Sequence, residues 1–379
     1  MKKWGVVLVT LLLLTALLSA CSRNVGDVEN SDVSTPVAAM VKTGLATVSS
    51  AAVAEDALTD RTVVAAVTVG DGGKIVACRL DEIETDAKLN AGKITREKDL
   101  RSKYAQGYDY GLASSSTVTK EWFEQVDALC DYVVGKTAAE VAEIPLENGV
   151  ATDEALRARC DLVISDFLEA IGKACDMAAD RGAQAGDTLS LSLTAADSTE
   201  QSDKAVCAAV QIAAVTLNSR GVVTDCLVDE TGKRVDVVDG AFVGDTGVYR
   251  SRKDQKTGAD DTSDSAKDGE WTASAKAFEE YVVGKTASQV KATPLTDGKP
   301  AADTDLAEKC TVRVAEMLQN VLKAIDGANE TKQTPSTATE TATAAKDGVL
   351  DKASKAADDV VSMADDAVSR IGDALTESR

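Results

Sequence analysis

The sequence predicts an α+β protein with two tandem homologous domains, each a small antiparallel sheet with helices on one face, followed by a C-terminal amphipathic helix. Three observations support this prediction. Several segments recur along the chain at a nearly constant spacing. In each copy, β-prone segments come before helical ones, an order typical of α+β domains. After the second copy, a last segment repeats small apolar residues with a helical rhythm.

The clearest repeat is the heptapeptide Tyr-Val-Val-Gly-Lys-Thr-Ala. It stands at residues 132–138 and again at 281–287, an offset of 281 − 132 = 149. The other matched pairs are residues 65–68 with 213–216 (offset 148), Cys78 with Cys226 (148), Trp122 with Trp271 (149) and Cys160 with Cys310 (150). The offset changes by only two residues along the chain, which indicates a duplication. We place the two domains at residues 41–184 and 185–328. Each is long enough to bury its own core.

Short β-prone segments open each copy. They cover residues 45–49, 62–69 and 74–80 in the first copy, and residues 189–194, 211–217 and 222–228 in the second. Gly72 and Gly73 separate the last two segments of the first copy, and Gly221 separates those of the second. Two β-prone segments across a glycine turn predict a hairpin in each copy.

A helix with one apolar face follows the strands in each copy. Its apolar residues are Trp122, Val126, Leu129 and Val133 in the first copy, and Trp271, Ala275, Phe278 and Val282 in the second. Their steps of four, seven and eleven place them on one helical face. We therefore expect both Trp side chains to be core anchors rather than platforms for a ligand.

The next helix in each copy is predicted from its cap. Gly135 and Gly284 end the preceding helices. Thr137 has Glu140 three residues on, and Thr286 likewise has Gln289, which is the pattern of a capping box. A last helix, over residues 162–178 and 312–325, closes each copy.

The C-terminal segment is predicted to lie outside the domains. Residues 329–348 are rich in Thr, Ala and Ser and are predicted to be a disordered linker. Residues 349–379 show a three-four rhythm of small apolar residues, which predicts an amphipathic helix. Its other face is mostly Asp, so we expect it to dock on a domain or a partner helix rather than on anionic lipid.

The N-terminus carries the pattern of an export signal. Met1, Lys2 and Lys3 form a basic start, and residues 4–18 are mainly apolar. As a helix this stretch rises roughly 22 Å, at about 1.5 Å per residue, against a hydrocarbon core of about 30 Å. It ends in Leu18-Ser-Ala-Cys21, which resembles the lipobox of bacterial lipoproteins.

That resemblance implies a lipid anchor. Residues 1–20 would be the signal peptide, Cys21 would take a diacylglyceryl group, and residues 21–40 would form a flexible tether. Two acyl chains hold a protein stably on a membrane. We expect the protein on the extracytoplasmic face of the cell membrane, with no other spanning segment.

The composition excludes several classes of function. The net charge of −21 becomes −23 once Lys2 and Lys3 are removed, and such a polyanion is repelled by nucleic-acid phosphates. We therefore expect no nucleic-acid partner. The sequence contains no His, which removes the usual general base and the commonest metal ligand. We predict that the protein is not an enzyme and holds no metal.

The cysteines do not form a metal or redox motif. With Cys21 lipidated, seven of the eight Cys remain, an odd number, and none stands in a C-x-x-C pair. Most are expected to be small core residues. If disulfides form, the symmetric choice is Cys78 with Cys160 and Cys226 with Cys310.

Three motifs that look catalytic or ligand-binding do not fit their full patterns. A P-loop ending in Gly135-Lys-Thr137 would need Gly where Cys130 stands, and a strand before it. Ser288-Gln-Val-Lys291 and Lys256-Thr-Gly258 occur in the wrong order for a penicillin-recognising serine enzyme. The acidic loop over residues 254–270 lacks the spacing of a calcium loop and is predicted to be solvated.

The two copies also resemble a degenerate FMN-binding domain of bacterial surface flavoproteins. The similar elements are Gly72-Gly-Lys-Ile75, residues 135–141 and Val163-Ile-Ser165. In that family a Thr before the last helix carries FMN covalently, and the matching residues here are Asp161 and Thr311. Duplicated clostridial-type surface lipoproteins show similar elements, here Tyr110-Gly111 and Lys120-Glu-Trp122.

These observations lead to one main hypothesis and one alternative. The main hypothesis is a membrane-anchored surface lipoprotein whose duplicated, non-enzymatic domains bind an unidentified ligand or protein partner, or serve a structural role, without a cofactor. The alternative is an FMN-binding flavoprotein of extracytoplasmic electron transfer, with Thr311 as its only candidate attachment residue. A solute receptor of a transporter fits least, because alternating βαβ units are absent.

Overall fold

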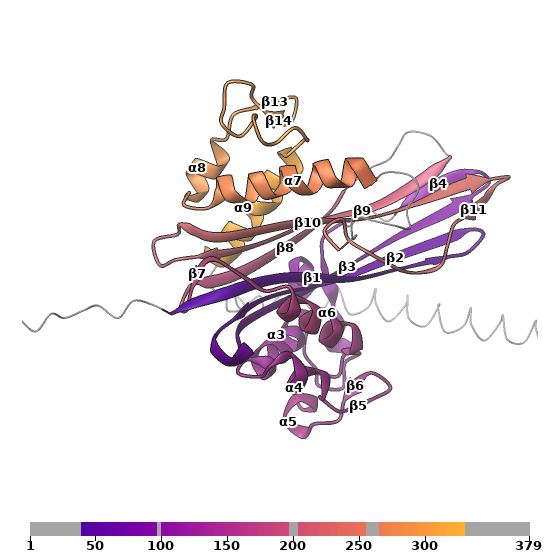
Figure 1. Cartoon of the computed structure of the whole chain (residues 1–379). Helices are drawn as coiled ribbons and strands as arrows, with labels where there is room; N and C mark the ends of the chain where they lie inside the picture. Colours follow the sequence, from indigo (N-terminus) through magenta and orange to yellow (C-terminus); the bar gives the residue numbers. More distant parts are fainter. Residues whose placement is uncertain (1–38, 97–99, 197–203, 255–264, 330–379) are drawn as a thin grey trace, which may run out of the picture.

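The computed structural model describes residues 39–96, 100–196, 204–254 and 265–329. Two antiparallel sheets lie face to face, and helices cover the outer face of each (Figure 1). The result is a four-layer arrangement of helices, sheet, sheet and helices. The predicted α+β class with antiparallel sheets is therefore confirmed. Cys21, the signal peptide and the segment 349–379 lie outside the described residues.

The first sheet is built mainly from the first half of the chain, residues 39–184. Its long strands are β1 (Met40–Val53), β2 (Ala57–Val69) and β3 (Ile75–Asn90), and β4 (Lys93–Arg96) pairs antiparallel with the end of β3. β2 pairs with β1 on one side and β3 on the other. The second edge of β1 is shared by β7 (Ala179–Gln184) and β12 (Gly247–Tyr249).

The second sheet comes from the second half of the chain, residues 185–329. Its order is β11 (Ala241–Val243), β10 (Val223–Val238), β9 (Ala205–Leu217) and β8 (Thr188–Ala196). The predicted hairpins are confirmed, and each strand is longer than its predicted apolar segment. The extensions carry both polar and apolar residues, and several of their apolar residues are buried, among them Leu58 of β2 and Val206 of β9.

Both halves share the order of a helix, a short helix, a pair of short strands and a last helix, and the first half has further short helices. The first half has η1 (Asp71–Gly73), α2 (Lys103–Gln106), η2 (Gly107–Tyr110), η3 (Leu112–Ser114), α3 (Trp122–Val133), α4 (Ala138–Ala142), β5 (Leu146–Glu147), β6 (Val150–Ala151), α5 (Glu154–Arg157) and α6 (Ser165–Asp176). The second half has α7 (Ser265–Val282), α8 (Ala287–Lys291), β13 (Leu295–Thr296), β14 (Lys299–Pro300) and α9 (Ala315–Asn329). No helix in these described ranges is long and apolar enough to cross a membrane.

Each sheet has its own core on its helix-covered face. In the first half, α3 and α6 pack on the outer face around Trp122, Phe167 and Val63. In the second half, α7 and α9 pack around Trp271 and Phe278. Trp122 and Trp271 are 3% and 5% exposed, so their predicted role as core anchors is confirmed.

The inner faces of the two sheets bury a further core that both halves share. Val64 and Ala66 of β2 pack with Ile212 and Ala214 of β9 in one cluster. A second cluster lies nearer the other end of the sheets and joins Leu58, Ala87 and Leu89 to Val206, Val235 and Phe242. Each half thus has a core of its own beneath its helices. The inner face of its sheet, however, is covered by the other half.

Strand β12 links the halves by crossing from one sheet to the other. It follows β11 of the second sheet in the chain and pairs with Ser49, Ser50 and Ala51 of β1 in the first sheet. Another main-chain hydrogen bond joins the halves nearby, where Phe242 N donates to Glu55 O at 2.8 Å. The predicted boundary between residues 184 and 185 falls at the end of β7, but the first sheet is completed from beyond that boundary.

Candidate functional site

The structure describes one of the two predicted site residues. Thr311 is exposed in the turn before α9. Its hydroxyl donates to a carboxylate oxygen of Glu270, and its main-chain N donates to Ser274 Oγ at 3.2 Å. The side chain thus ties the turn to the first part of α7.

Asp161, the equivalent residue of the first half, makes a similar connection through its carboxylate. Asp161 Oδ2 accepts from the main-chain N and from the hydroxyl of Thr117, both at 2.6 Å. Its own main-chain N donates to Gln125 at 2.8 Å, and Gln125 is the counterpart of Ser274. These hydrogen bonds with the Thr117 hydroxyl and amide hold the pKa of Asp161 below its usual value, against the opposing effect of burial.

The repeated heptapeptide fastens a helix end to a hairpin. Gly135 ends α3 with φ +83°, and Gly284 ends α7 with the same φ. Gly135 N donates to Ile75 O at 2.8 Å, and Gly284 N donates to Val223 O at 2.8 Å. Each glycine therefore places its turn against the start of the third strand of its sheet.

The polar residues of the heptapeptide complete this junction. Thr137 and Glu140 form the predicted capping box of α4, and Thr286 and Gln289 form that of α8. Lys136 Nζ lies 4.5 Å from the centroid of the ring of Tyr132, and the corresponding distance in the second half is 3.7 Å. The Lys and Thr that resemble part of a P-loop thus make local contacts, the Lys with a Tyr ring and the Thr as a helix cap.

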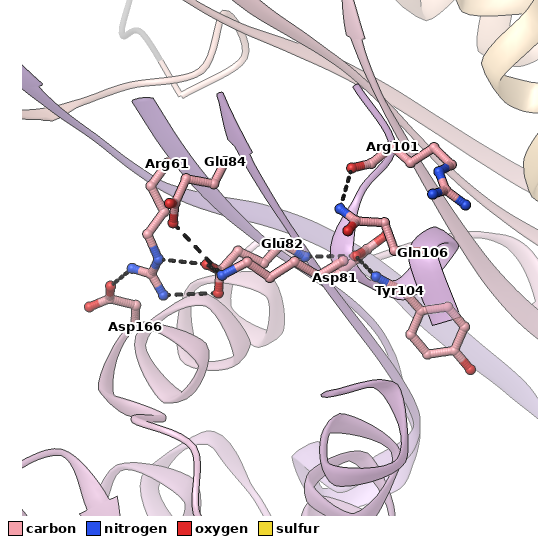
Figure 2. Close-up of polar contacts among 9 residues, drawn as sticks. Arg61, Asp81, Glu82, Glu84, Arg101, Tyr104, Gln106 and Asp166 are labelled. Carbon is pink, nitrogen blue, oxygen red and sulfur yellow. Dashed lines mark hydrogen bonds and ion pairs between the residues drawn. The ribbon is translucent and has the colours of Figure 1, made fainter. Parts of the chain in front are cut away.

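A buried carboxylate holds a loop against the third strand of the first sheet. Asp81 of β3 is 4% exposed. Its Oδ1 accepts from the main-chain N of Glu82 at 2.7 Å and of Tyr104 at 3.1 Å (Figure 2). Burial raises the pKa of Asp81 to about 7, although hydrogen bonds from Ser102, Tyr104 and Glu82 oppose this rise. We call this arrangement a carboxylate clamp.

A charged network extends from the clamp across the outer face of the sheet. Glu82 accepts a forked pair of bonds from Arg61, at 2.8 and 3.0 Å, and a third from Lys103 Nζ at 2.6 Å. Arg61 also pairs with Asp166 of α6 (Figure 2), and Lys103 Nζ lies 3.7 Å from Glu84 Oε2. The network joins two strands, α2 and α6, so Glu82, which is 3% exposed, is fully engaged by its own chain.

The second half has its own carboxylate clamp. Asp229 Oδ1 of β10 accepts from the main-chain N of Glu230 at 2.8 Å and of Lys253 at 3.2 Å. Burial raises the pKa of Asp229 to about 6, opposed by hydrogen bonding to Ser251 and by the charge of Lys253. Arg252 N also donates to Glu230 O at 2.9 Å. The loop therefore lies along β10 as its counterpart lies along β3.

A row of polar side chains crosses the shared inner core. Tyr249 of β12 donates to Asp60 of β2, and Thr62 of β2 donates to Ser49 of β1 at 3.1 Å. Thr62 Oγ1 lies 3.4 Å from Thr231 Oγ1 of the facing sheet. Burial raises the pKa of Asp60 to about 6, although the hydrogen bond from Tyr249 lowers it.

A cavity between the sheets, lined by Leu58, Asp86, Arg96, Leu100 and Val206 among others, measures about 10 Å³. That volume is of the order of one water molecule, whereas pockets for small molecules measure about 300–1,000 Å³. In the parts of the chain that the structure describes, no three Cys, Asp or Glu residues are grouped to hold a metal ion.

The clamp residues were not predicted from the sequence, although a signal for them exists. Asp81-Glu82 recurs as Asp229-Glu230 at offset 148, and Ser102 recurs as Ser251 at offset 149. Both matches follow the same register as the cysteines and tryptophans. A repeated acid directly after a β-prone segment would have identified them.

Comparison with known proteins adds no family or function. No protein-family model, no curated protein and no solved structure matches this chain.

Proposed function

We propose that this chain is a lipid-anchored surface lipoprotein of the extracytoplasmic face of the cell membrane. Its soluble part would be a duplicated, non-enzymatic unit that binds a partner or serves a structural role. Leu18-Ser-Ala-Cys21 after a basic and apolar start supports the anchor. The two carboxylate clamps, at matching positions of matching strands, support the duplication.

The observation that favours a non-enzymatic role is how the buried acids are used. A catalytic carboxyl needs a path to substrate and room for it beside the reacting atoms. Asp81, Glu82 and Asp229 are each less than 5% exposed and accept hydrogen bonds from groups of their own chain. These carboxylates hold loops to strands, as a rigid binding or structural unit requires.

The anchor is tested by labelling cells with a fatty-acid analogue. The wild-type chain should take up the label, and Cys21→Ala should not, because the lipid is attached to the thiol of Cys21. Cys207→Ala is a suitable control, since it removes a thiol from the folded part and should leave labelling unchanged. Label that persists in the Cys21→Ala variant would disprove the anchor.

The second candidate function is a covalent flavin carrier, and one observation favours it. Thr311 is exposed in a turn, where a flavin-attaching enzyme could reach its hydroxyl. Against it, Lys309 and Cys310 replace the small residues that precede the Thr in the resembling family, and the hydroxyl is bonded to Glu270. The intact mass after co-expression with a flavin transferase decides between the two: a gain of one FMN phosphodiester, lost in Thr311→Ala, would favour the flavoprotein.

A further inference from the structure

The two halves exchange short edge segments, and the exchange runs in both directions. Strand β12 of the second half pairs with residues 49–51 of β1 in the first sheet. In return, Arg101 of the first half forms an antiparallel bridge with Thr194 of β8 in the second sheet. Along the chain, each segment lies just before the serine of its own carboxylate clamp, Ser251 or Ser102. Each half thus reaches across to the first strand of the other.

Strands β1 and β8 occupy equivalent places in the two sheets. Lys42 of β1 pairs with Val69 of β2, and Thr188 of β8 pairs with Leu217 of β9. Val69 and Leu217 are matched residues of the repeat, at offset 217 − 69 = 148. Their partners therefore correspond as well, at offset 188 − 42 = 146. This offset allows the two exchanges to be compared residue by residue.

The two exchanges have the same register. The counterpart of Arg101 is Arg250, at offset 149, and the counterpart of Thr194 is Val48, since 194 − 146 = 48. The ladder of β12 runs antiparallel to β1, and one step beyond Tyr249 it places Arg250 opposite Val48. The bridge made by the first half and the ladder made by the second half are thus one pairing, made once in each direction.

The shared inner core also contains matched residues from both halves. The pairs, all at offset 148, are Leu58 with Val206, Ala87 with Val235 and Ile94 with Phe242 in one cluster, and Val64 with Ile212 and Ala66 with Ala214 in the other. A contact to which both sides bring the same patch is the arrangement of a two-fold symmetric homodimer. The two halves therefore contact each other as two copies of one subunit would.

One matched contact differs, and the difference decides which halves fit together. Tyr249 donates to the buried carboxyl of Asp60. The counterparts of these two residues are Leu100 and Ala208, which line the small cavity between the sheets. Two first halves would bury Asp60 opposite Leu100 without a donor, and two second halves would leave the Tyr249 hydroxyl opposite Ala208. Because a buried polar group without a partner is costly, a first half favours a second half over a copy of itself.

We propose that this contact face also joins two copies of the chain. The first half of one copy pairs with the second half of the other, and the remaining two halves pair in the same way, which gives a closed, half-exchanged dimer. Every contact within each pair of halves is the one made inside a single chain. The difference between the two forms is confined to the connection between β7 and β8.

That connection is short, exposed and held by few bonds. Residues 185–187 form a turn in which Asp187 N donates to Gln184 O at 3.0 Å, and Gln184 N donates to Asp187 Oδ2 at 2.9 Å. Gly186 has a φ of +99°. Opening the turn breaks these two hydrogen bonds but no contact of the shared inner core. Fully extended, the chain from Gln184 to Thr188 spans roughly 13 Å, so the two units of the dimer would meet at the end of the sheets where β7 lies (Figure 1).

Protein concentration and the length of the turn decide between the two forms. In a single chain, a short connection holds the halves at an effective concentration in the millimolar range. The exchanged dimer should therefore form when chains refold together at high concentration, while their halves are still unpaired. Shortening the turn should favour the dimer, because a chain that cannot fold back on itself has to pair with another.

The test detects pairing of β1 from one chain with β12 from another. Ser50 and Val248 are directly opposite in this ladder, and the Cα atoms of such a pair are about 4.5–5.5 Å apart, which suits a disulfide. One full-length chain carries Ser50→Cys and another carries Val248→Cys. The two are mixed in denaturant with reductant, refolded together in detergent and then mildly oxidised. A link between the two chains is expected in peptide mapping, with a yield that rises with protein concentration.

Three controls define this link. A single chain that carries both substitutions should link within itself, which shows that the two thiols can react. Variants that are refolded separately and mixed afterwards should not link. Val283→Cys in place of Val248→Cys puts an exposed thiol just after α7, away from β1, and should not link to Ser50→Cys. The seven cysteines of the described residues are free, so the pairings considered from the sequence, Cys78 with Cys160 and Cys226 with Cys310, are not made, and wild-type chains give the background.

Changing the turn provides a second measurement. Deletion of residues 185–187 should yield mainly dimer, by light scattering, at concentrations where the wild-type chain is a monomer. A flexible Gly/Ser insert after Gly186 should instead lower the yield of the link between chains several-fold. A deletion variant that stays monomeric and melts like the wild-type chain would overturn the proposal. So would the absence of a link between chains at every concentration while the double variant links within itself, or an equal link after separate refolding.

Discussion

The hydroxyl of Tyr249 lies 2.8 and 2.7 Å from the two carboxylate oxygens of Asp60 and donates to that carboxyl. Tyr249 comes from the second half of the chain and Asp60 from the first. Both lie where the two sheets meet, and Asp60 is 1% exposed. This pair is therefore a buried polar contact between the two halves of the chain.

Removing the hydroxyl should weaken the interface between the halves. Tyr249→Phe leaves the ring in place but deprives the buried carboxyl of its donor, which should lower the free energy of unfolding by about 1–3 kcal/mol. Urea unfolding measures the change. Tyr108→Phe is the control: Tyr108 is 54% exposed, and its loss should cost no more than about 0.5 kcal/mol. Equal effects of the two substitutions would show that the bond to Asp60 contributes nothing.

Stability should fall as the pH rises from 5 to 8. Burial raises the pKa of Asp81 to about 7 and those of Asp60, Asp225 and Asp229 to about 6. Each value lies above that of the unfolded chain, so the folded state binds the proton more tightly. The resulting stability is fully present below about pH 4 and is lost as the pH rises through 6 to 7.

The measurement is the free energy of unfolding at both pH values. We expect it to be higher at pH 5 by at least about 1 kcal/mol. Asp81→Asn should reduce this difference, because the amide is neutral throughout, while the exposed Asp71→Asn should leave it unchanged. A free energy of unfolding that is higher at pH 8 would contradict the assignment. Below about pH 4, Asp161, whose pKa is lowered, should begin to act in the opposite direction.

Gly44 should be intolerant of any side chain. A Cβ atom there would lie 1.9 Å from the main-chain O of Ala174 in α6, so the helix would have to leave the sheet. Gly44→Ala should therefore destabilise the protein by more than about 3 kcal/mol or prevent folding. Gly172→Ala, in α6 itself, meets open space and should stabilise the protein by about 0.5–1 kcal/mol. Similar melting temperatures for the two variants would refute the close packing of α6 on β1.

The second half should not fold well alone. Excising residues 41–181 would expose the inner face of the second sheet, including Leu193 and Ile212, and would remove the strand with which β12 pairs. We expect a broad, noncooperative melt or aggregation. Supplying residues 39–184 as a separate chain should restore a cooperative melt. A sharp melt of the excised protein alone, near that of the full chain, would mean that the shared inner core is dispensable.

Local structure could be predicted from the sequence because its determinants are local. The glycine turn between β2 and β3, the apolar spacing from Trp122 to Val133 and the Thr137 cap each lie within a dozen residues. Packing of the sheets was not predicted. The run Val63–Val67 is fully buried because alternate residues face α-helices and the other sheet. A continuous apolar run indicates burial on both faces but does not say what covers the second face.

The candidate site was less predictable than the fold, for two physical reasons. Asp81 directly follows the predicted β-prone segment 74–80, where an acidic residue usually faces solvent. Its partner, the amide of Tyr104, is a main-chain group that every residue except Pro carries. Strand β12 has three residues and no pattern of its own, and its partner, near Ser50, lies almost two hundred positions earlier in the chain. Contacts over such separations leave no periodic signal in the sequence.

The route of β12 also sets an order of assembly. As the chain is made from its N-terminus, β1, β2 and β3 are complete long before residue 247 exists. The edge of β1 at Ser49, Ser50 and Ala51 stays unpaired until then, and so does the carboxyl of Asp60. The first half therefore cannot reach its final form while the ribosome is still producing the second, unlike the usual domain-by-domain sequence. A chain cut short before Tyr249 would carry an open strand edge, the kind of surface on which other strands assemble.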